Sequence, residues 1–440
     1  MNTPVIDFIK KYRNSSSARF HMPGHKGINF TGHEEGDITE ITGTGSAFDY
    51  TGIVSQSEAN ASSLFGFGKT YYCTEGSTQC IKAMIYLAKQ AALLSGRDGS
   101  IIMASRNVHK AFVFACGQND VDVIWLDGSL TPEKAEKSLE NIDKKPFALY
   151  VTSPDYYGKT VDITGLSEVC NRYGIMLLVD NAHGAYLKFL SPSLHPVSLG
   201  AFMSADSAHK TLPVLTGGAY LQLSDKVPEE ISGMAKEALA MFCSTSPSWL
   251  ILQSLDGCNA YLANGYEKKL AEFTAKLSNL KNKLTITGWN VLSSDPLRLV
   301  IDTRSKGYTG YEVYEILEEK QIQGEFADFE HLVLMLTPEN TDNELKRLEN
   351  ALLSIPPSGK IPDTAPSVSK LPKKVMPIRQ ALLSGWEKVD ADKAVGRICA
   401  FPVSPFPPEV PIVISGEEID QNTVSLMKAY GIENVFVVKK

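Results

Sequence analysis

The chain has 440 residues, of which 43% are hydrophobic and 21% are charged, and its formal net charge is -7. This length is enough for a large domain with a smaller companion, and the negative charge argues against a nucleic-acid-binding surface. No apolar run reaches membrane-spanning length, and residues 1–14 lack the apolar core and cleavage site of a signal peptide. We therefore expect a cytoplasmic protein with no nucleic-acid or membrane partner.

The first half of the chain predicts an N-terminal arm and then an α/β domain with a mainly parallel sheet. Residues 1–14 form a short amphipathic stretch, and Gly76 to Ser95 predicts a helix with one apolar stripe. The next strands are short runs that are apolar on both faces, as in parallel strands covered by helices. The predicted strands are 101–104, 121–126, 147–152, 175–179, 201–204 and 218–223, with helices at 131–142 and 166–173 between them.

The second half predicts a long helical stretch near 248–280 and then a small α+β unit. The pattern indicates strands at 297–302 and 332–336 and helices at 311–320 and 342–353. Residues 356–377 are rich in Pro, Ser and Lys, which predicts a linker or surface excursion. We divide the chain into an arm (1–60), a large domain (61–285) and a small C-terminal domain (286–440) that includes this excursion.

One lysine stands in an unusual setting. The run Ser204-Ala-Asp-Ser-Ala-His-Lys210-Thr follows a predicted strand and precedes Thr216-Gly-Gly-Ala and another strand. Ser207, His209 and Thr216 could donate to a phosphate, and Lys210 could condense with an aldehyde as a Schiff base. The alternative is an exposed loop lysine, and this run alone does not separate the two.

An aspartate at the end of a neighbouring strand favours the first interpretation. The strand Ile175–Val179 ends in Asp180-Asn-Ala-His183, and a buried acid costs several kcal/mol unless it has a strong partner. The protonated nitrogen of a pyridine ring is such a partner, and that ring then withdraws electrons from a bound substrate. His183 would lie near the phenolic oxygen of the ring. A helix cap for Asp180 and a structural role for His183 are the simpler alternatives.

A cofactor that combines an aldehyde, a pyridine ring and a phosphate is pyridoxal 5'-phosphate. Two further elements fit it. Glu75-Gly76-Ser77-Thr78 begins a helix whose backbone N–H groups could bind a phosphate, and His109 follows a strand and could stack on the ring. All four elements fall at strand ends or helix starts, at the edge where open α/β sheets bind ligands. Nucleotide-loop, zinc-protease and serine-hydrolase motifs are absent from the sequence, and seven cysteines without a CxxC pair argue against a metal site.

The sequence resembles the Orn/Lys/Arg decarboxylases of the bacterial type, and the resemblance covers nearly the whole chain. It is carried by Arg19-Phe-His-Met-Pro-Gly-His-Lys26-Gly, Asp37-Ile-Thr-Glu40, Gly76-Ser-Thr78, Val108-His-Lys110, Asp180…His183-Gly184, Ser207-Ala-His-Lys210-Thr-Leu-Pro, Thr245-Ser-Pro-Ser248…Ser254-Leu-Asp256 and Gly307-Tyr-Thr-Gly-Tyr311. It implies an aspartate-aminotransferase-like fold (fold type I of the pyridoxal-phosphate enzymes). It also implies the short form of the family, without an N-terminal receiver-like domain.

The resemblance also implies roles for individual residues. Lys210 would carry the cofactor as a Schiff base, Asp180 would pair with the ring nitrogen, and His109 would stack on the ring. Ser77, Thr78, Ser207 and His209 would bind the phosphate beside Gly76. Thr216 would reach a phosphate across the interface of a homodimer or larger homo-oligomer with shared active sites.

The sequence departs from the family pattern on the substrate side. The usual Asp-Glu-Ala-His is Asp180-Asn181-Ala-His183 here, and Glu75 replaces an asparagine before Gly76. A histidine expected after Glu40 is missing, and the Tyr-Pro-Pro-Gly-Ile-Pro segment is matched only loosely by residues 404–411. The pattern therefore predicts the cofactor site more strongly than the substrate.

The leading hypothesis is decarboxylation of lysine, arginine or ornithine to the amine, as in polyamine biosynthesis. An apolar pocket would hold the substrate carboxylate perpendicular to the ring, and His209 or Lys210 would return the proton. Glu325 or Asp328 could pair with the distal cation of the substrate, and His25 is a third candidate on the substrate side.

Two other functions stay open on the sequence alone. Another pyridoxal-phosphate reaction, such as aminotransfer or lyase chemistry, would use an arginine for the substrate carboxylate, and Arg298 is the candidate. A non-catalytic regulatory paralogue is the second alternative.

Overall fold

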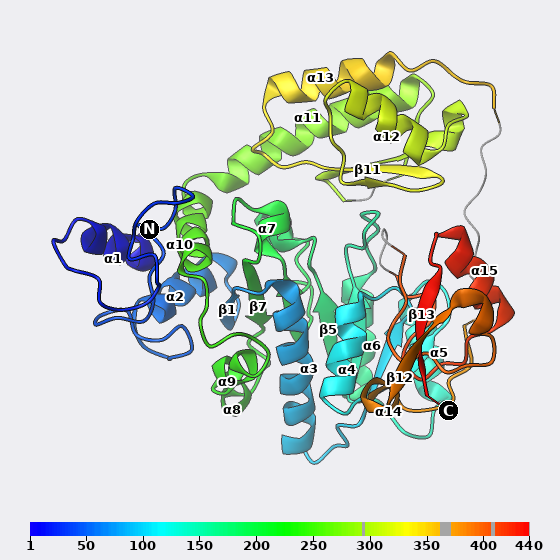
Figure 1. Cartoon of the computed structure of the whole chain (residues 1–440), viewed down its shortest axis with the longest axis horizontal. Coiled ribbons are helices and arrows are strands. Elements are labelled where there is room, and N and C mark those ends of the chain that lie inside the picture. Colours follow the sequence, from blue (N-terminus) through cyan, green and yellow to red (C-terminus); the bar gives the residue numbers. More distant parts are fainter. Residues whose placement is uncertain (293–294, 361–370, 406–409, 440) are drawn as a thin grey trace. The chain divides into compact units, whose positions relative to one another are not determined.

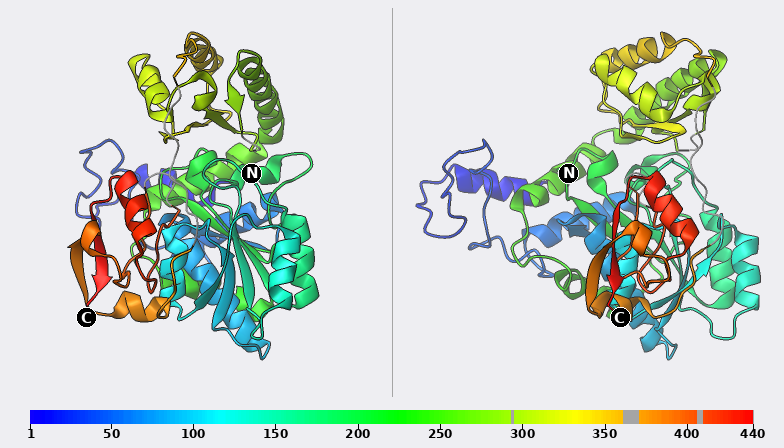
Figure 2. Two further views of the ribbon diagram at one scale, coloured as in Figure 1. Left: turned by 90° about the vertical axis from the view of Figure 1, so that its right-hand side faces the viewer. Right: turned by 45° about the vertical axis from the view of Figure 1, so that its right-hand side comes forward.

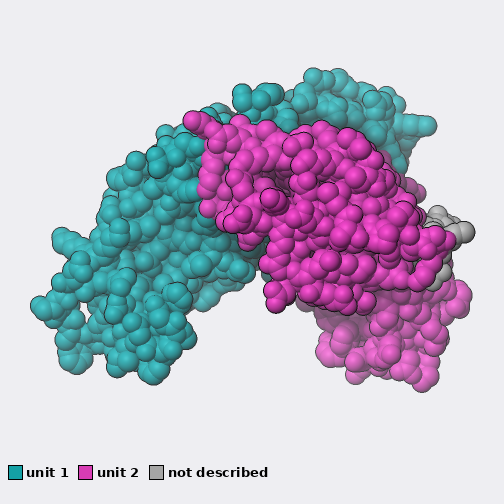
Figure 3. All heavy atoms as spheres, turned by 90° about the horizontal axis from the view of Figure 1, so that it is seen from above, with its two compact units in different colours: residues 1–104, 130–152, 162–267 teal, residues 105–129, 153–161, 268–440 magenta. Residues whose placement is uncertain are grey.

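The computed structural model describes residues 1–292, 295–360, 371–405 and 410–439. The chain folds into two compact units (Figure 3). Unit 1 comprises residues 1–104, 130–152 and 162–267, and unit 2 comprises residues 105–129, 153–161 and 268–440. The division at residues 60 and 285 stays a prediction, and the proposed excursion at 356–377 falls partly outside the described residues.

Unit 1 is built on a twisted sheet (Figures 1 and 2), whose strands lie in the order β1-β7-β6-β5-β4-β2. The strands β2, β4, β5 and β6 run parallel, and β7 is antiparallel to both β1 and β6. The mainly parallel sheet is therefore confirmed. The strands are β1 (Lys69–Cys73), β2 (Ile101–Ser105), β4 (Ala148–Thr152), β5 (Met176–Asp180), β6 (Met203–Asp206) and β7 (Ala219–Leu223).

Helix α3 (Gly76–Leu94) packs against this sheet, as its apolar stripe predicts. Met84, Leu87 and Ala91 are buried at helical spacing, and each large apolar side chain contributes roughly 1.5–3 kcal/mol on burial. The other helices of the unit are α1 (Pro4–Arg13), α2 (Ile53–Phe65), α5 (Pro132–Glu140), α6 (Ile163–Tyr173), η1 (Ala185–Phe189), α7 (Ala208–Thr211), α8 (Glu229–Ser232), α9 (Ala235–Ala240) and α10 (Trp249–Ala263).

The helical stretch predicted near 248–280 is two helices. Helix α10 ends at Ala263, and α11 (Tyr266–Ile286) begins three residues later, at the boundary between the units. Gly265 adopts a φ of +79° between them, a conformation that glycine reaches at low cost and that interrupts the helical backbone. The apolar periodicity continues across this break, so the pattern alone did not show it.

The N-terminal arm is fixed to α10 by a buried carboxylate. The backbone N–H groups of Val5 and Ile6 both donate to Oδ2 of Asp256, at 3.0 Å, and Ser57 Oγ donates to Oδ1 at 2.5 Å. Unsatisfied N–H groups at a helix N-terminus attract a negative charge. Asp256, part of the family-like segment Ser254-Leu-Asp256, thus caps α1 from a distant helix.

Unit 2 contains an antiparallel sheet in the order β10-β11-β9-β8 and a two-stranded sheet of β12 and β13. The latter pair packs on a core that includes Ile419, Val424, Met427 and Val435. The predicted small α+β unit is present. Besides α11, the elements of unit 2 are α4 (Lys110–Gln118), β3 (Asp122–Leu126), β8 (Asn290–Val291), β9 (Arg298–Asp302), η2 (Thr303–Lys306), α12 (Gly310–Glu319), β10 (Phe326–Ala327), β11 (His331–Met335), α13 (Asp342–Leu353), α14 (Ile378–Leu383), β12 (Trp386–Asp390), η3 (Ala391–Lys393), α15 (Gln421–Ala429) and β13 (Asn434–Val438).

Within the described ranges, no helix combines the length and the apolar character needed to cross a bilayer.

Candidate active site

Lys210 lies in the short helix α7, directly after strand β6. The strand ends at Asp206, Ser207 is the N-cap, and the Nζ atom of Lys210 lies 3.2 Å from Nε2 of His183. His183 belongs to the turn that follows the adjacent strand β5. The lysine therefore points at the neighbouring strand end instead of into solvent, which is the setting that a Schiff-base lysine requires.

Asp180 is the last residue of β5 and is 2% exposed. Its Oδ2 accepts a hydrogen bond from the hydroxyl of Tyr150, at 3.2 Å, and its Oδ1 accepts one from the backbone N–H of Ala182, at 3.1 Å. Asp180 is paired with Ala205 in the register of β5 and β6. Since parallel strands end at one edge, Asp180 and the Lys210 helix belong to the same site.

Three loops that carry the predicted phosphate ligands converge in unit 1. The backbone N–H of Gly76 donates to the carbonyl of Gly217, at 2.7 Å, and joins the start of α3 to the loop that contains Thr216. His209 Nδ1 donates to the carbonyl of Gly218, at 2.9 Å, and joins α7 to the same loop. The sequence-predicted ligands of this group are thus brought together: Gly76, Ser77, Thr78, Ser207, His209 and Thr216.

The donors in this region fit a phosphate group. Ser207 is 1% exposed, and in the part of the chain that the structure describes its hydroxyl is buried without a hydrogen-bond partner. A buried hydroxyl of this kind costs about 1–3 kcal/mol, which a bound phosphate oxygen would recover. Gly76, with a φ of +70°, leaves open space where a Cβ would stand. The residues present therefore suit pyridoxal phosphate.

His209 is the second titratable group beside Lys210. Burial and the nearby charge of Lys210 lower the pKa of His209, against the opposing effect of its bond to Gly218. Because Nδ1 carries the hydrogen that Gly218 accepts, Nε2 bears the lone pair of the neutral ring. At neutral pH His209 is therefore an acceptor at Nε2.

His25 belongs to unit 1, and His109 belongs to unit 2. His25, in unit 1, accepts from the N–H of Gly27 at Nδ1 and holds Asp37 through Nε2, at 3.2 Å. These residues lie in two of the family-like motifs of the arm. His109, in unit 2, is the N-cap of α4, and its Nδ1 accepts from the N–H of Ala111 at 3.1 Å. Its predicted stacking role stays a prediction.

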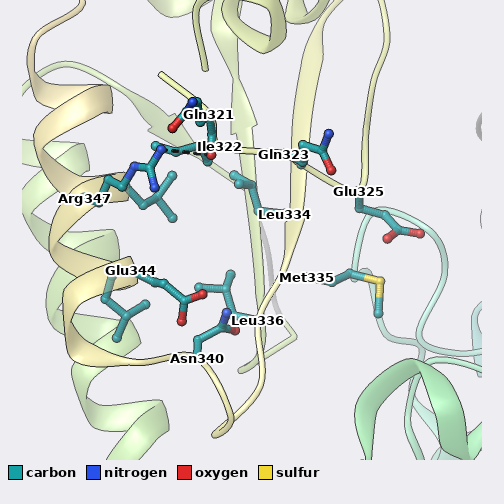
Figure 4. A pocket seen from close by; sticks show the side chains of 13 residues that line it. Gln321, Ile322, Gln323, Glu325, Leu334, Met335, Leu336, Asn340, Glu344 and Arg347 are labelled. Atoms are coloured by element: carbon teal, nitrogen blue, oxygen red, sulfur yellow. Dashed lines mark hydrogen bonds between the residues drawn. The ribbon is translucent and has the colours of Figure 1, made fainter. Parts of the chain in front are cut away.

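Glu325 and Asp328, the two candidate acids for the substrate cation, differ in their exposure and in their hydrogen bonds within the protein. Glu325 is exposed and lines a pocket of about 290 Å³ in unit 2, on the side opposite Arg347 (Figure 4). Asp328 is buried and accepts hydrogen bonds from Tyr157, His331 and the backbone N–H of Glu330. Of the two, Glu325 keeps the more accessible carboxylate.

Internal hydrogen bonds lower the pKa of Asp328. Burial alone would raise it, but the bonds from His331, the Glu330 N–H and Tyr157 together bring it below its ordinary value. Burial alone would lower the pKa of His331, but the bond to Asp328 and nearby negative charges raise it. These opposite shifts are those of a stabilised ion pair.

Arg298 is also engaged by the protein itself. It lies in β9, is 2% exposed, and its Nη1 donates to the carbonyls of Asp155 and Tyr156, at 2.8 and 2.6 Å. These contacts fix the backbone of a neighbouring loop of unit 2. They weaken the case for Arg298 as the carboxylate ligand of an aminotransferase.

Two polar clusters escaped the sequence reasoning. Asp206 accepts hydrogen bonds from four side chains at the end of β6, and Arg106 forms a bidentate pair with Glu417, at 2.9 and 2.6 Å. Asp206 could have been noticed, because it is an acid at an apolar strand end, as Asp180 is. Arg106 and Glu417 are 311 residues apart, and no local pattern joins them.

Comparison with known proteins agrees with this geometry. Residues 3–292 match the family model of the Orn/Lys/Arg decarboxylase major domain, and residues 364–431 match that of its C-terminal domain. The chain is 30% identical to the Bacillus subtilis protein YaaO, over 96% of this chain and 93% of that protein. It is 28% identical to an arginine decarboxylase of Bacillus subtilis, over 96% and 92% of the two chains.

The lysine decarboxylase LdcF of Francisella novicida has a similar fold. Its crystal structure matches with a TM-score of 0.80 and 17% identity, over 99% of this chain and 81% of that one. The aspartate-aminotransferase-like fold is thereby confirmed. The two family models and the YaaO match lead to one conclusion: this chain belongs to the Orn/Lys/Arg decarboxylase family.

Proposed function

We propose that this chain decarboxylates a basic amino acid, lysine, arginine or ornithine, with pyridoxal phosphate held by Lys210. The observation that carries the proposal is the 3.2 Å approach of Lys210 Nζ to His183, beside the strand end that bears the buried Asp180. Family membership supports it, and so does the arginine decarboxylase activity named for the Bacillus subtilis relative. Production of amines for polyamine biosynthesis in the cytoplasm is part of the same proposal.

The residues of unit 1 would hold the cofactor at both of its ends. Lys210 would bind the aldehyde carbon, Asp180 would keep the ring nitrogen protonated, and the N-terminus of α3 with Ser207 would bind the phosphate. When bound, the cofactor supplies an electron sink for the electrons left on the substrate α-carbon as carbon dioxide leaves. His183 would sit beside Lys210 and orient the ring.

Proton return to the α-carbon falls to a side chain close to it. The lowered pKa of His209 keeps its Nε2 unprotonated at neutral pH, so His209 is better suited to orient groups than to donate. Lys210, once released, carries protons to give. We therefore assign the proton transfer to Lys210 and a positioning role to His209.

Assembly into a homodimer or larger homo-oligomer is part of the proposal. Thr216 is exposed beside the loops that would bind the phosphate. The arm exposes large apolar side chains, including Phe20 at 94% and Phe30 at 76%. Large exposed aromatic side chains of this kind are typical of a surface that a partner covers. A second copy of the chain would explain both features.

The test is an amino-acid panel. Purified protein with added pyridoxal phosphate is incubated with lysine, arginine and ornithine, while carbon dioxide, amine and keto acid are measured. Equal amounts of carbon dioxide and amine from one of the three are expected. Keto acid without carbon dioxide would establish the aminotransferase alternative, and bound cofactor without turnover of any substrate would favour the regulatory paralogue.

A further inference from the structure

A second carboxylate lies buried beneath the Lys210 site. Asp206 ends strand β6, is 0% exposed, and accepts hydrogen bonds at both oxygens. Its donors are Asn181 Nδ2 at 2.9 Å, Ser204 Oγ at 3.0 Å, His195 Nε2 at 2.8 Å and Gln222 Nε2 at 3.3 Å. The protein therefore supplies four hydrogen-bond donors to this one carboxylate.

The four donors to Asp206 are neutral groups. His195 Nδ1 accepts from the backbone N–H of Val197, at 3.2 Å, so this nitrogen carries no hydrogen. The hydrogen therefore lies on Nε2, which donates to Asp206, and the imidazole is neutral. Asn181, Ser204 and Gln222 cannot carry a positive charge, so none of these donors would neutralise a carboxylate at Asp206.

Asn181 connects this carboxylate to the turn after β5. Its Nδ2 donates to Asp206, and its Oδ1 is buried without a partner in the described part of the chain. A Cβ added at Gly184 would lie 2.0 Å from that Oδ1. The amide thus occupies the space between Asp206 and Gly184, and it restrains the turn from both sides.

The restrained turn carries His183. The carbonyl of Asn181 accepts from the N–H of Gly184, at 2.8 Å, which closes the turn around His183, and His183 reaches Lys210 Nζ at 3.2 Å. Asp206 also immediately precedes Ser207, the N-cap of the lysine helix α7. One carboxylate is therefore bonded to both segments that bring His183 and Lys210 together.

We propose that Asp206 is a positioning residue for the reaction at Lys210 and that Asn181 is the neutral partner that Asp206 requires. This rests on the proposed function. It also explains the departure from the family pattern at position 181. An aspartate at position 181 would place its carboxylate about 3 Å from that of Asp206, and the usual glutamate would also bring a second negative charge to this buried site, where like charges repel.

The test uses the sign of the charge. Asp206→Asn removes a negative charge, Asn181→Asp adds one, and the double variant Asn181→Asp/Asp206→Asn exchanges carboxylate and amide. Each protein is loaded with pyridoxal phosphate, and the visible band of the lysine-bound cofactor is titrated with pH. Nearby negative charge favours the protonated form, so the midpoint should fall in Asp206→Asn and rise in Asn181→Asp, by on the order of one pH unit each. The double variant should return toward the wild-type midpoint.

Other titratable groups near the pair stay in place in every variant. His195 and Tyr220 lie near Asp206, and His183 and His209 lie beside Lys210. Ser204→Ala is the matched control, because it removes one donor to Asp206 without breaking the link to Asn181, and its midpoint should stay unchanged. Asn181→Ala keeps the charge and breaks only the link, so cofactor affinity should fall about tenfold with little change in midpoint.

The outcomes separate the two proposals. Suppose that the wild-type protein shows the band, but its midpoint shifts in the same direction, or not at all, in Asp206→Asn and Asn181→Asp. That result would overturn the role of Asp206 and leave the proposed function standing. If Asn181→Asp does not fold, the cofactor affinities of Asn181→Ala and Ser204→Ala decide, and equal affinities overturn the role. A wild-type protein with no visible band contradicts the proposed function itself.

Discussion

Three Asp-x-x-His patterns begin at a buried aspartate, one of them Asp206-Ser-Ala-His209, and the other two differ in what their histidines contact. Asp180-Asn-Ala-His183 follows β5 in unit 1, and Asp328-Phe-Glu-His331 leads into β11 in unit 2. In both, a tyrosine hydroxyl donates to the carboxylate: Tyr150 to Asp180 at 3.2 Å and Tyr157 to Asp328 at 2.7 Å. His331 turns back onto Asp328, at 3.2 Å, whereas His183 reaches forward to Lys210.

We infer from this difference that Asp180 serves a bound ligand, whereas Asp328 stabilises the fold. Asp328 and His331 satisfy each other, and their opposite pKa shifts mark a stabilised pair. The histidine of the first pattern contacts a lysine that does not belong to the pattern, next to a buried serine hydroxyl that lacks a partner in the described chain. A buried polar group that lacks a hydrogen-bond partner within the protein indicates a place for a ligand.

The strongest test of this comparison removes the lysine. Lys210→Ala should abolish the visible cofactor band and lower kcat/KM by roughly 10³-fold or more, because the cofactor loses its covalent attachment and the substrate its proton donor. Absorption spectra and carbon dioxide release measure the two effects. Lys226→Ala is the matched control, since Lys226 is exposed and donates to the carbonyl of Gly200. An unchanged band in Lys210→Ala would remove the basis of the comparison.

The second test compares the two aspartates directly. Asp180→Asn keeps the shape of the side chain and removes its charge, so kcat/KM should fall by about 10²–10³-fold, while Asp328→Asn should change it less than about threefold. Both proteins are assayed with the substrate identified in the panel. Similar losses in the two variants would show that the division into a functional and a structural acid is wrong.

The third test asks what Asp328 contributes instead. Asp328→Asn removes the charge that His331 and Tyr157 bind, so the free energy of unfolding should fall by about 2 kcal/mol. The pKa of Asp328 is lowered in the folded protein, so this group adds stability at pH values above its pKa in the unfolded chain. The pKa of His331 is raised in the folded protein, so this group adds stability at pH values below its pKa in the unfolded chain. The loss should therefore be largest between about pH 4 and pH 6.5 and smaller above it.

Denaturant unfolding of wild type and Asp328→Asn across pH 4 to 9 measures this profile. Tyr157→Phe serves as a companion variant, because it removes one neutral donor to Asp328 and leaves the ion pair with His331 intact. Its loss should be smaller and nearly independent of pH. A loss in Asp328→Asn that grows toward pH 9 would contradict the ion pair.

Local patterns predicted helix α3 and the strands from β2 to β7 that lie in unit 1, but not β1 or α2, and they indicated candidate cofactor residues that stay predictions. Lys210, Asp180 and Ser77 each lie within a few residues of a strand or helix end, and parallel strands bring such ends to one edge. This is why short motifs far apart in the chain could be assigned to one site. The departure at Asn181 was visible too, but its partner Asp206 became clear only from the register of β5 and β6.

The roles of isolated charged residues could not be predicted in the same way. Asp328 and Arg298 were candidates because of their charge, but their partners Tyr157 and Asp155 lie more than 140 residues away. Such pairings depend on tertiary packing, which local periodicity does not encode. The break at Gly265 was missed for a related reason, since one backbone dihedral angle changes the helix without changing its apolar pattern.

The last test concerns the acid that stays accessible in unit 2. Glu325 is exposed just before β10, whereas Asp328, three residues later, is closed by its own partners. If Glu325 pairs with the distal cation of the substrate, Glu325→Gln should raise KM by up to about fivefold with kcat nearly unchanged, because an exposed ion pair contributes at most about 1 kcal/mol. Steady-state kinetics over a range of salt concentrations measure this, and the effect should shrink as salt screens the pair. Glu330→Gln serves as a nearby control of equal charge. If KM at low salt is the same in Glu325→Gln and wild type, neither Glu325 nor Asp328 binds the distal cation. Recognition of the cation would then belong to other residues.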